Sequence, residues 1–172
     1  MPIIYSSKLF ENHNIIYLYS SDVIKNCKKI GTYLNFGFYS NNYEKENYLF
    51  LKDNNKIIAL LVYFFYEVDS EKIPAIDIVV VDEEYRRKGI TTFFYNHLLN
   101  IYGKLISGIC LNKSDRKIDG SFGLWVKLIK KHSPKLFNIY TNSLEKFSFY
   151  RAFKSKHSIK RRIFICSKPK DF

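Results

Sequence analysis

Residues that bind metal ions or cross-link a chain are scarce in this sequence. It has three cysteines among 172 residues, Cys27, Cys110 and Cys166, and these are widely spaced, with no CxxC pair and no Cys/His pairing. Metal sites need such clusters, so we expect no bound metal. The odd cysteine count is typical of a protein of the reducing cytoplasm. The first residues also lack the basic segment and long apolar segment of a secretion signal, so we expect a cytoplasmic protein.

Long apolar runs and glycine-rich phosphate motifs are also missing. The longest apolar run, residues 57–66, is too short to cross a bilayer as a helix, so we expect no membrane contact. The glycines form neither the GxxxxGK[ST] pattern of P-loop proteins nor the GxGxxG pattern of dinucleotide-binding proteins. The sequence therefore argues against both of these nucleotide-binding classes.

Aromatic and basic residues, by contrast, are abundant. Hydrophobic residues make up 47% of the chain and aromatic residues 17%, which predicts one folded domain over residues 1–172. The net charge is +12, and residues 127–170 hold 13 Lys or Arg against one acid, Glu145. Residues 141–172 form the last part of this basic C-terminal third. The charge favours nucleic acid, an acidic protein or the phosphates of a cofactor as a partner.

The spacing of apolar residues predicts a mixed α/β (α+β) fold. Short apolar runs predict strands at residues 14–19, 48–52, 56–66, 74–81, 105–111, 136–140 and 162–166. Helical spacing predicts helices at residues 23–30, 90–102 and 121–131, with residues 143–156 partly helical. Asp53-Asn54-Asn55 reads as a hairpin turn. The strand–helix–strand order around residues 90–102 predicts a central βαβ unit in a mostly antiparallel sheet.

A charged segment joins the strand at residues 74–81 to the helix at residues 90–102, and residues 79–94 read VVVDEEYRRKGITTFF. A helix N-terminus presents N–H groups without partners and partial positive charge, so it attracts an anion. A glycine lets the anion approach the backbone, and nearby cations strengthen the attraction to a pyrophosphate. The expected anion-binding residues are Arg86, Arg87, Lys88, Gly89, Ile90 and Thr91. A plain solvated turn would also fit this composition.

Residues 81–91 resemble the signature of the GNAT superfamily of N-acyltransferases. Its core is Arg or Gln, two residues, Gly, one residue, then Gly or Ala, and Arg86, Gly89 and Thr91 fall on those positions. Thr91 replaces the usual small residue, and Arg87 stands where the family often has glycine. The resemblance implies a GNAT-like fold with a twisted, mostly antiparallel sheet. It also implies transfer of an acetyl group from acetyl-CoA to a primary amine, without a metal.

The resemblance further implies how the cofactor lies. In the family, the strand before the loop diverges from the next strand, and the pantetheine arm of the cofactor pairs with the backbone of the first. The residues expected to provide that backbone are Val79, Val80 and Val81. Residues 105–111 and 121–131 would supply the next strand and the next helix. The predicted element order agrees with the family over roughly residues 14–140.

Amine acetylation needs a base for the attacking amine, and an acid for the leaving thiolate helps it. Asp77 interrupts an otherwise apolar strand, so we expect burial to raise its pKa and to make it the base. Glu67 and Asp69, at the end of the preceding strand, are second choices. An Asp77 that points outward, or that accepts backbone hydrogen bonds, would have no such role.

The family often places the acid, a tyrosine, on the helix after the next strand. Leu124-Trp125 occupies that place here, and an indole N–H does not deliver a proton at neutral pH. Trp125 is expected beside the pantetheine or the acetyl group, or else in the core. A second alignment takes residues 142–153 as this helix and makes Tyr150 the acid. Some phage-encoded acetyltransferase-like proteins carry a serine, a small residue and Leu-Trp in this helix, and similar residues here are Ser121, Gly123, Leu124 and Trp125.

Two functions stay open at this point. The first is an acetyl-CoA-dependent N-acetyltransferase whose amine acceptor the sequence does not identify. The second is a catalytically weak or inactive protein on the same scaffold, which binds nucleic acid or an acidic protein through the basic C-terminal third. The missing acid tyrosine and the uneven charge support the second function, because fold resemblance alone does not fix activity.

Overall fold

The computed structural model describes residues 4–5, 26–43, 45–54, 56–107, 121–153 and 161–167. It divides into two compact units. Unit 1 comprises Met1–Phe64 and Ile78–Phe94, and unit 2 comprises Phe65–Asp77 and Tyr95–Phe172. The expectation of a single domain stays a prediction. Among the described residues, no helix is long and apolar enough to cross a membrane.

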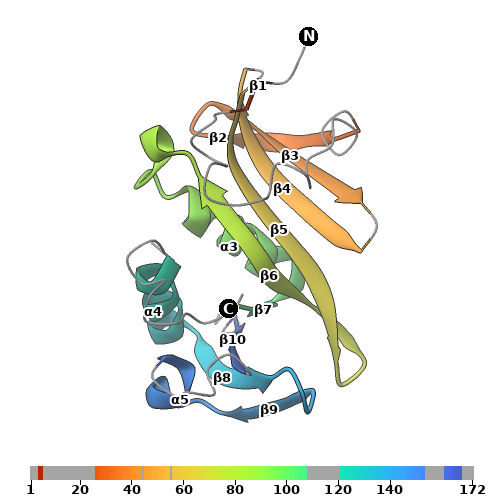
Figure 1. Cartoon of the computed structure of the whole chain (residues 1–172), viewed down its shortest axis with the longest axis vertical. Coiled ribbons are helices and arrows are strands. Elements are labelled where there is room, and N and C mark those ends of the chain that lie inside the picture. Colours follow the sequence, from red (N-terminus) through yellow and green to blue (C-terminus); the bar gives the residue numbers. More distant parts are fainter. Residues whose placement is uncertain are drawn as a thin grey trace, which may run out of the picture. The chain divides into compact units, whose positions relative to one another are not determined.

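Unit 1 is built on an antiparallel meander, which Figure 1 draws in orange and yellow. Its strands, in order of pairing, are β2 (Lys28–Tyr33), β3 (Phe36–Tyr43), β4 (Glu46–Asp53) and β5 (Lys56–Val68). The short strand β1 (Ile4–Tyr5) pairs with β5 in parallel. Strand β5 is almost entirely apolar, and its residues 57–63 are buried, so it forms the centre of the unit's core.

Tight turns connect these strands. Leu34 and Asn35, between β2 and β3, have φ of 49° and 69°, and Asn54, between β4 and β5, has φ of 53°. Two consecutive residues with positive φ are typical of the type I′ turn, whose twist matches that of the flanking strands. The predicted hairpin around residue 54 is confirmed. Asp69 and Ser70, with φ of 51° and 64°, likewise connect β5 to β6 (Glu71–Val81).

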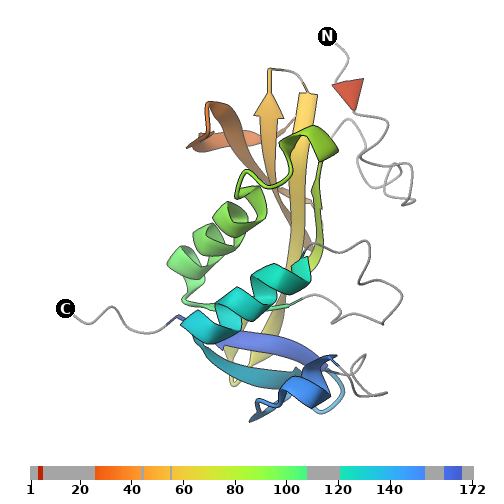
Figure 2. The ribbon, with the colours of Figure 1, turned by 90° about the vertical axis from the view of Figure 1, so that its left-hand side faces the viewer.

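A βαβ unit follows, as predicted. Strand β6 leads through the 3₁₀ helix η2 (Glu83–Tyr85) into helix α3 (Ile90–Tyr102) and then strand β7 (Lys104–Ile106), which pairs with β6 in parallel at Ala75 and Ile106. Figure 2 shows α3 as a regular helix that begins after this charged connection. Gly103, with φ of 69°, ends the helix, and its N–H donates to the Leu99 carbonyl at 2.8 Å.

Unit 2 continues with antiparallel pairing in the order β7, β10 (Arg161–Cys166), β8 (Ser133–Asn138) and β9 (Ser143–Lys146). Two helices complete it, α4 (Ser121–Lys131) and the short α5 (Phe149–Phe153). The core residues of these strands are fully buried, and they are Leu105, Ile106, Leu136, Phe137, Ile163 and Ile165. The predicted strands at residues 136–140 and 162–166 and the helix at residues 121–131 are confirmed, with shifts of up to three residues at strand ends.

One predicted element is wrong. Residues 28–30, expected as the end of a helix at residues 23–30, lie in strand β2, and residues 23–25 are outside the described residues. Pairing with β3, which the sequence did not reveal, supplies the backbone partners of this segment, and a bulge between Lys29 and Gly31 interrupts the ladder. The expected strand at residues 14–19 also lies outside the described residues.

Two further predictions are refined. The expected strand at residues 105–111 is described as β7 up to Ile106, and residues 108–111, with Cys110, lie outside the described residues. The ambiguous residues 143–156 divide into strand β9 and helix α5, with residues 154–156 not described. The predicted class, a mixed and mostly antiparallel sheet with a central βαβ unit, is confirmed.

Candidate functional site

Residues 86–91 comprise the connection between η2 and α3 and the first two residues of α3; they are called the 86–91 loop and lie wholly in unit 1. Arg87 and Gly89 have φ of 63° and 76°, so two alternate residues adopt the left-handed conformation. The Phe93 N–H donates to the Gly89 carbonyl at 2.9 Å, which makes Gly89 the residue that precedes the first helical turn. The loop therefore turns sharply and delivers its backbone to the start of a helix.

The start of α3 is suited to an anion. The N–H groups of a first helical turn have no partner within the helix, and the helix dipole adds partial positive charge there. The first turn of α3 contains no acidic residue that could neutralise this charge. Ile90 is only 2% exposed and anchors the turn in the core, whereas Gly89 is exposed. The backbone at this point is thus both fixed and accessible.

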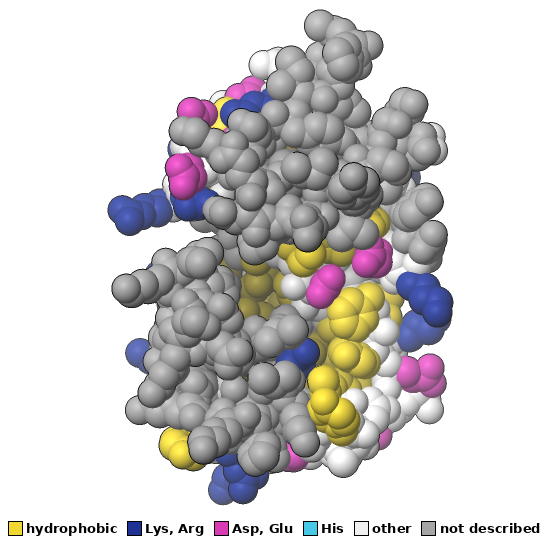
Figure 3. Space-filling model, in the orientation of Figure 1, with side chains coloured by type: hydrophobic (Ala, Val, Ile, Leu, Met, Phe, Trp, Pro, Cys, Tyr) yellow, Lys and Arg dark blue, Asp and Glu magenta, His cyan; other side chains and the backbone are white. Residues whose placement is uncertain are grey.

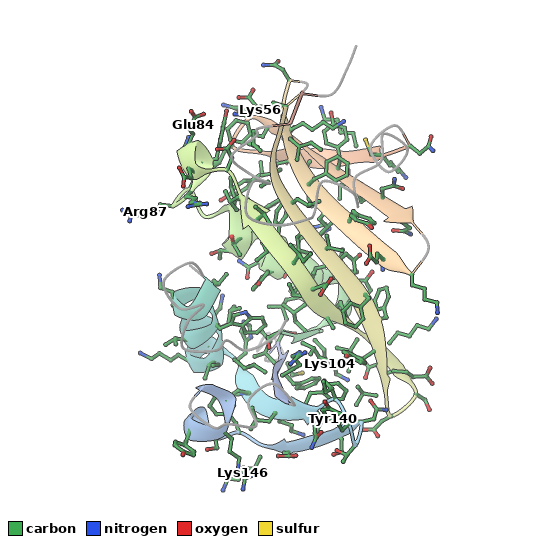
Figure 4. The ribbon with its side chains drawn as sticks, in the orientation of Figure 1. Lys56, Glu84, Arg87, Lys104, Tyr140 and Lys146 are labelled. Atoms are coloured by element: carbon green, nitrogen blue, oxygen red, sulfur yellow. The ribbon has the colours of Figure 1, made fainter. Side chains whose placement is uncertain are left out.

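The three cations of the loop differ in their contacts. Arg86 is partly engaged, because its Nε–H donates to the Val81 carbonyl at 3.1 Å and its guanidinium lies 3.5 Å from a Glu83 carboxylate oxygen. The Lys88 ammonium lies 4.9 Å from the ring centre of Tyr85. Arg87 is exposed, and Figure 4 shows its side chain pointing away from the ribbon. Arg86 therefore braces the loop, and Arg87 remains extended into solvent.

A polar cluster fastens η2 to the hairpin between β4 and β5. The Tyr85 hydroxyl donates to the Asp53 carboxylate at 2.9 Å, and this hydrogen bond, followed by burial, raises the pKa of Tyr85. The Lys56 ammonium lies 3.1 Å from the buried Asp82 carboxylate and 3.8 Å from that of Glu84. The hydrogen bond to Asp82 is the main cause of the raised pKa of Lys56. Figure 4 shows Lys56 and Glu84 at the same end of unit 1.

Tyr33, the last residue of β2, also contacts the loop, and the sequence did not identify it. Its hydroxyl donates to the Lys88 carbonyl at 3.1 Å, and its ring stacks on Phe93 with centroids 4.1 Å apart and planes 18° apart. A Cβ atom at Gly89 would lie 2.9 Å from the Tyr33 hydroxyl. The only signal in the sequence is the pair Leu34-Asn35 between Tyr33 and Phe36, which is compatible with a hairpin turn.

The valines expected to pair with the cofactor lie on β6 in unit 1, just before η2. They are partly buried, and Val80 packs against a core cluster that includes Phe50 and Leu60. The structure thus brings together, in one unit, two groups of predicted residues: Val79–Val81 and the 86–91 loop. Their role in cofactor binding stays a prediction.

Asp77, the predicted base, lies in unit 2. The expectation that it is buried in an apolar strand is wrong, because the residue is exposed, although its neighbours at positions 73–76 are buried. Glu67 is exposed near the end of β5, where its carbonyl accepts a hydrogen bond from the Asn142 side chain at 2.9 Å. Asp69 occupies the turn between β5 and β6. The roles of these three acids stay predictions.

The two candidates for the acid also lie in unit 2. Trp125, on α4, is 4% exposed, and its ring centroid lies 5.3 Å from that of Tyr95. This contact is typical of a core aromatic residue. Tyr150, on α5, is 65% exposed. Of the two, only Tyr150 has a titratable group that solvent or a ligand can reach.

No group of three or more potential metal ligands occurs in the part of the chain that the structure describes. His97, on α3, is half-buried, and desolvation lowers its pKa. Cys27 and Cys166 are free thiols, and the Cys27 sulfur lies 3.6 Å from the Lys52 ammonium.

The family model of the acetyltransferase (GNAT) family matches residues 13–113. That match covers more than half of the chain and includes the 86–91 loop. The chain belongs to the GNAT acetyltransferase family. No curated protein matches the sequence.

Several solved structures of GNAT proteins are similar to this one at low sequence identity. A ribosomal-protein-alanine N-acetyltransferase from Brucella melitensis biovar Abortus 2308 is 13% identical, with 47% of this chain and 64% of that chain covered and a TM-score of 0.38. A diaminobutyrate acetyltransferase from Paenibacillus lautus, in complex with L-2,4-diaminobutyric acid and coenzyme A, is 12% identical, with 73% and 72% covered and a TM-score of 0.43.

A GNAT family acetyltransferase from Elizabethkingia anophelis with acetyl-CoA bound is 16% identical, with 73% of this chain and 77% of that chain covered and a TM-score of 0.40. The chain spans less than two thirds of the length of the Brucella protein. All three TM-scores are below 0.5, so the family assignment rests on the family model.

Proposed function

We propose that this GNAT family member is an N-acetyltransferase that uses acetyl-CoA as its cosubstrate and acetylates a primary amine. The observation that carries the proposal is the 86–91 loop, which has a left-handed Gly89, an exposed helix N-terminus without a first-turn acid, and three cations. These features suit a pyrophosphate, the group that links the two halves of coenzyme A. We further propose that the protein acts in the cytoplasm.

The residues proposed to hold the cofactor form two sets. The backbone N–H groups of the 86–91 loop would bind the pyrophosphate, with Arg87 and Lys88 adding positive charge. The backbone of Val79–Val81 would pair with the pantetheine arm. When bound, acetyl-CoA supplies an acetyl thioester, which a neutral amine can attack.

The proposed proton transfers involve two exposed side chains. Asp77 would take a proton from the ammonium form of the acceptor, directly or through a water molecule, so that the amine can attack. Tyr150 would give a proton to the sulfur of the leaving thiolate. Its exposure allows proton exchange with solvent, which the buried Trp125 indole cannot provide.

Binding of acetyl-CoA to the full chain tests the proposal. We expect calorimetric titration to give a saturable complex, and Arg87→Glu to weaken it about tenfold, because a repelled phosphate loses roughly 1.4 kcal/mol of attraction. Lys130→Glu, which makes the same change of charge at an exposed position on α4, is the matched control and should bind as the wild type does. Equal weakening by both variants, or no heat at millimolar acetyl-CoA, would refute the proposed site.

Formation of an N-acetyl product tests the chemistry. With a panel of primary amines, we expect release of the free coenzyme A thiol and a mass increase of one acetyl group in at least one acceptor. Asp77→Asn should reduce the rate most at low pH, where the acceptor is mainly protonated and deprotonation limits the attack. An unchanged pH profile in Asp77→Asn would remove Asp77 from the mechanism.

A second candidate function is binding of nucleic acid or an acidic protein. Lys135 on β8 lies directly opposite Lys146 on β9, and both are exposed. Like charges that face each other across two strands destabilise the pair, and a bound polyanion would relieve this repulsion. On the face that Figure 3 shows, the described Lys and Arg side chains lie at separate places.

The second candidate predicts salt-dependent binding. Affinity for a single-stranded DNA or RNA oligonucleotide should fall steeply between about 50 mM and about 200 mM salt, because binding releases counterions from the phosphates. The double variant Lys135→Gln with Lys146→Gln should bind less tightly and show a shallower salt dependence. Binding that the double variant leaves unchanged would assign the contact to another part of the chain.

A further inference from the structure

Tyr33 makes two contacts with the connection into α3, and they act on different parts of it. The hydroxyl donates a hydrogen bond to the Lys88 carbonyl, and the ring stacks on Phe93 in the first turn of the helix. The turn at Leu34 and Asn35 returns the chain immediately after Tyr33, and β3 pairs with β2 as far as Tyr33 itself. The position of the Tyr33 ring is therefore fixed on one side by the pairing of β2 with β3 and on the other by stacking on helix α3.

The hydrogen bond fixes the direction of a peptide group. A peptide bond is planar and nearly always trans, so the N–H of one residue points away from the carbonyl that precedes it. Since the Lys88 carbonyl is directed to the Tyr33 hydroxyl, the Gly89 N–H is directed to the opposite side. Without this contact, the exposed Lys88–Gly89 peptide, which precedes the left-handed Gly89, could rotate, and the donor would lose its fixed direction.

We propose that Tyr33 is a positioning residue of the 86–91 loop, whose hydroxyl orients the Lys88–Gly89 peptide so that the Gly89 N–H is presented to the pyrophosphate. This inference rests on the proposed function. Tyr33 acts through the peptide group and does not itself touch the ligand. Strand β2 thereby takes part in binding through Tyr33, although Tyr33 lies 55 residues before Lys88 in the sequence.

The same contact gives a second reason, besides the backbone conformation, why a side chain at position 89 is unfavourable. A side chain at position 89 would meet the Tyr33 hydroxyl at 2.9 Å, in addition to the strain of a φ of 76°. Removing the Tyr33 hydroxyl would remove the steric clash with a side chain at position 89 but would leave the backbone strain there. The effects of substitutions at positions 33 and 89 should therefore be coupled, since two residues in contact do not behave additively.

Titrations of the full chain with coenzyme A, inorganic pyrophosphate and pantetheine test the inference. Tyr33→Phe keeps the stacked ring and removes only the hydroxyl, so the Kd for coenzyme A and for pyrophosphate should rise about three- to tenfold. Binding of pantetheine, which has no pyrophosphate, should not change. If the role of Tyr33 were purely structural, Tyr33→Phe would weaken the binding of all three ligands alike or would lower only the melting temperature.

Tyr39→Phe is the matched control. Tyr39 lies on β3 in the same unit, and its ring stacks on Phe50 with centroids 5.6 Å apart. It should bind all three ligands as the wild type does. In the background of Tyr33→Phe, Gly89→Ala should lower the melting temperature less than it does alone.

The possible results separate the inference from the proposed function. Pyrophosphate binding that Tyr33→Phe weakens supports the role of Tyr33 even if no acetyl transfer occurs. Coenzyme A binding that is the same in wild type and Tyr33→Phe overturns that role while the proposed function stands. If the wild type binds neither coenzyme A nor pyrophosphate, both are wrong.

Discussion

Arg87 holds a backbone conformation that residues with a side chain adopt at a cost. Its φ of 63° lies in the left-handed region, where a Cβ atom crowds the following carbonyl and destabilises the chain by about 1–2 kcal/mol. The GNAT signature often has glycine at this position. The chain thus retains an exposed cation at a place where its backbone favours glycine, which suggests that the charge has a use.

Two substitutions separate the strain at Arg87 from its charge. Arg87→Ala and Arg87→Gly both remove the guanidinium, but only glycine relieves the left-handed strain. We expect Arg87→Gly to be more stable to urea than Arg87→Ala by about 0.5–1 kcal/mol, after allowing for the greater freedom of glycine in the unfolded chain. Equal unfolding midpoints for the two variants would show that the loop relaxes without strain.

The sequence predicted the contiguous part of the candidate site and missed the rest. The 86–91 loop was predictable because its residues are adjacent and the chemistry of a helix N-terminus needs only local information. Tyr33 was not, because its contact joins residues 55 apart and depends on a strand that the sequence misassigned. The sequence also favoured a buried Asp77, which is exposed, since an apolar neighbourhood in sequence does not determine which side of a strand is covered.

At the scale of elements, η2 is held by a hydrogen bond that ionisation would break. The Tyr85 hydroxyl donates to Asp53, in the hairpin between β4 and β5, and this contact raises the pKa of Tyr85 above its ordinary value of 10.0. The folded state therefore holds the phenolic proton more tightly than the unfolded state. The resulting stabilisation is complete below pH 10.0 and is lost as the pH rises through the folded-state pKa.

Tyr85→Phe tests this attachment. The variant keeps the ring and cannot ionise, so its unfolding free energy should decline less steeply than that of the wild type as the pH rises above 10.0. Some decline should remain, because the pKa of Lys56 is raised by Asp82 and acts in the same direction. Urea unfolding at several pH values measures both slopes. Parallel curves for wild type and variant would contradict the contribution of Tyr85.

Helices α3 and α4 were predicted better than strands β2 and β3. Helices α3 and α4 match their predicted ranges because apolar residues recur at helical spacing, and a left-handed Gly103 ends α3. Strand β2 has an irregular pattern with exposed residues and a bulge, so only its pairing with β3 makes it a strand. Strand β3 contains glycine and a polar stretch, FGFYSNNY, which gives little alternation to detect.

At the scale of the whole molecule, three elements supply residues to both units. The division falls within β5, β6 and α3, after Phe64, before Ile78 and after Phe94. A strand or a helix loses its hydrogen bonds cooperatively when it unfolds. Continuous elements of this kind favour unfolding of the two units together, and the single domain stays a prediction.

Coupled units should unfold in one transition. The sequence has a single tryptophan, Trp125, which lies in unit 2, so its fluorescence reports on that unit alone. Circular dichroism in the far ultraviolet reports on the secondary structure of both units. We expect the two urea curves to coincide. A fluorescence transition that is displaced from the circular dichroism transition would instead identify two independently unfolding domains.

The hydrogen bonds that Tyr33 and Asp53 make near the 86–91 loop decide whether the GNAT signature could be transferred to another protein with its structure intact. A peptide of residues 79–94, or a foreign scaffold that received it, would carry every signature residue but neither the Tyr33 hydroxyl nor the Asp53 carboxylate. Such a graft would keep the residues of the signature, but the contacts that orient its peptide groups would be lost. A graft that keeps these two hydrogen bonds therefore needs an aromatic hydroxyl and a turn carboxylate from two other strands.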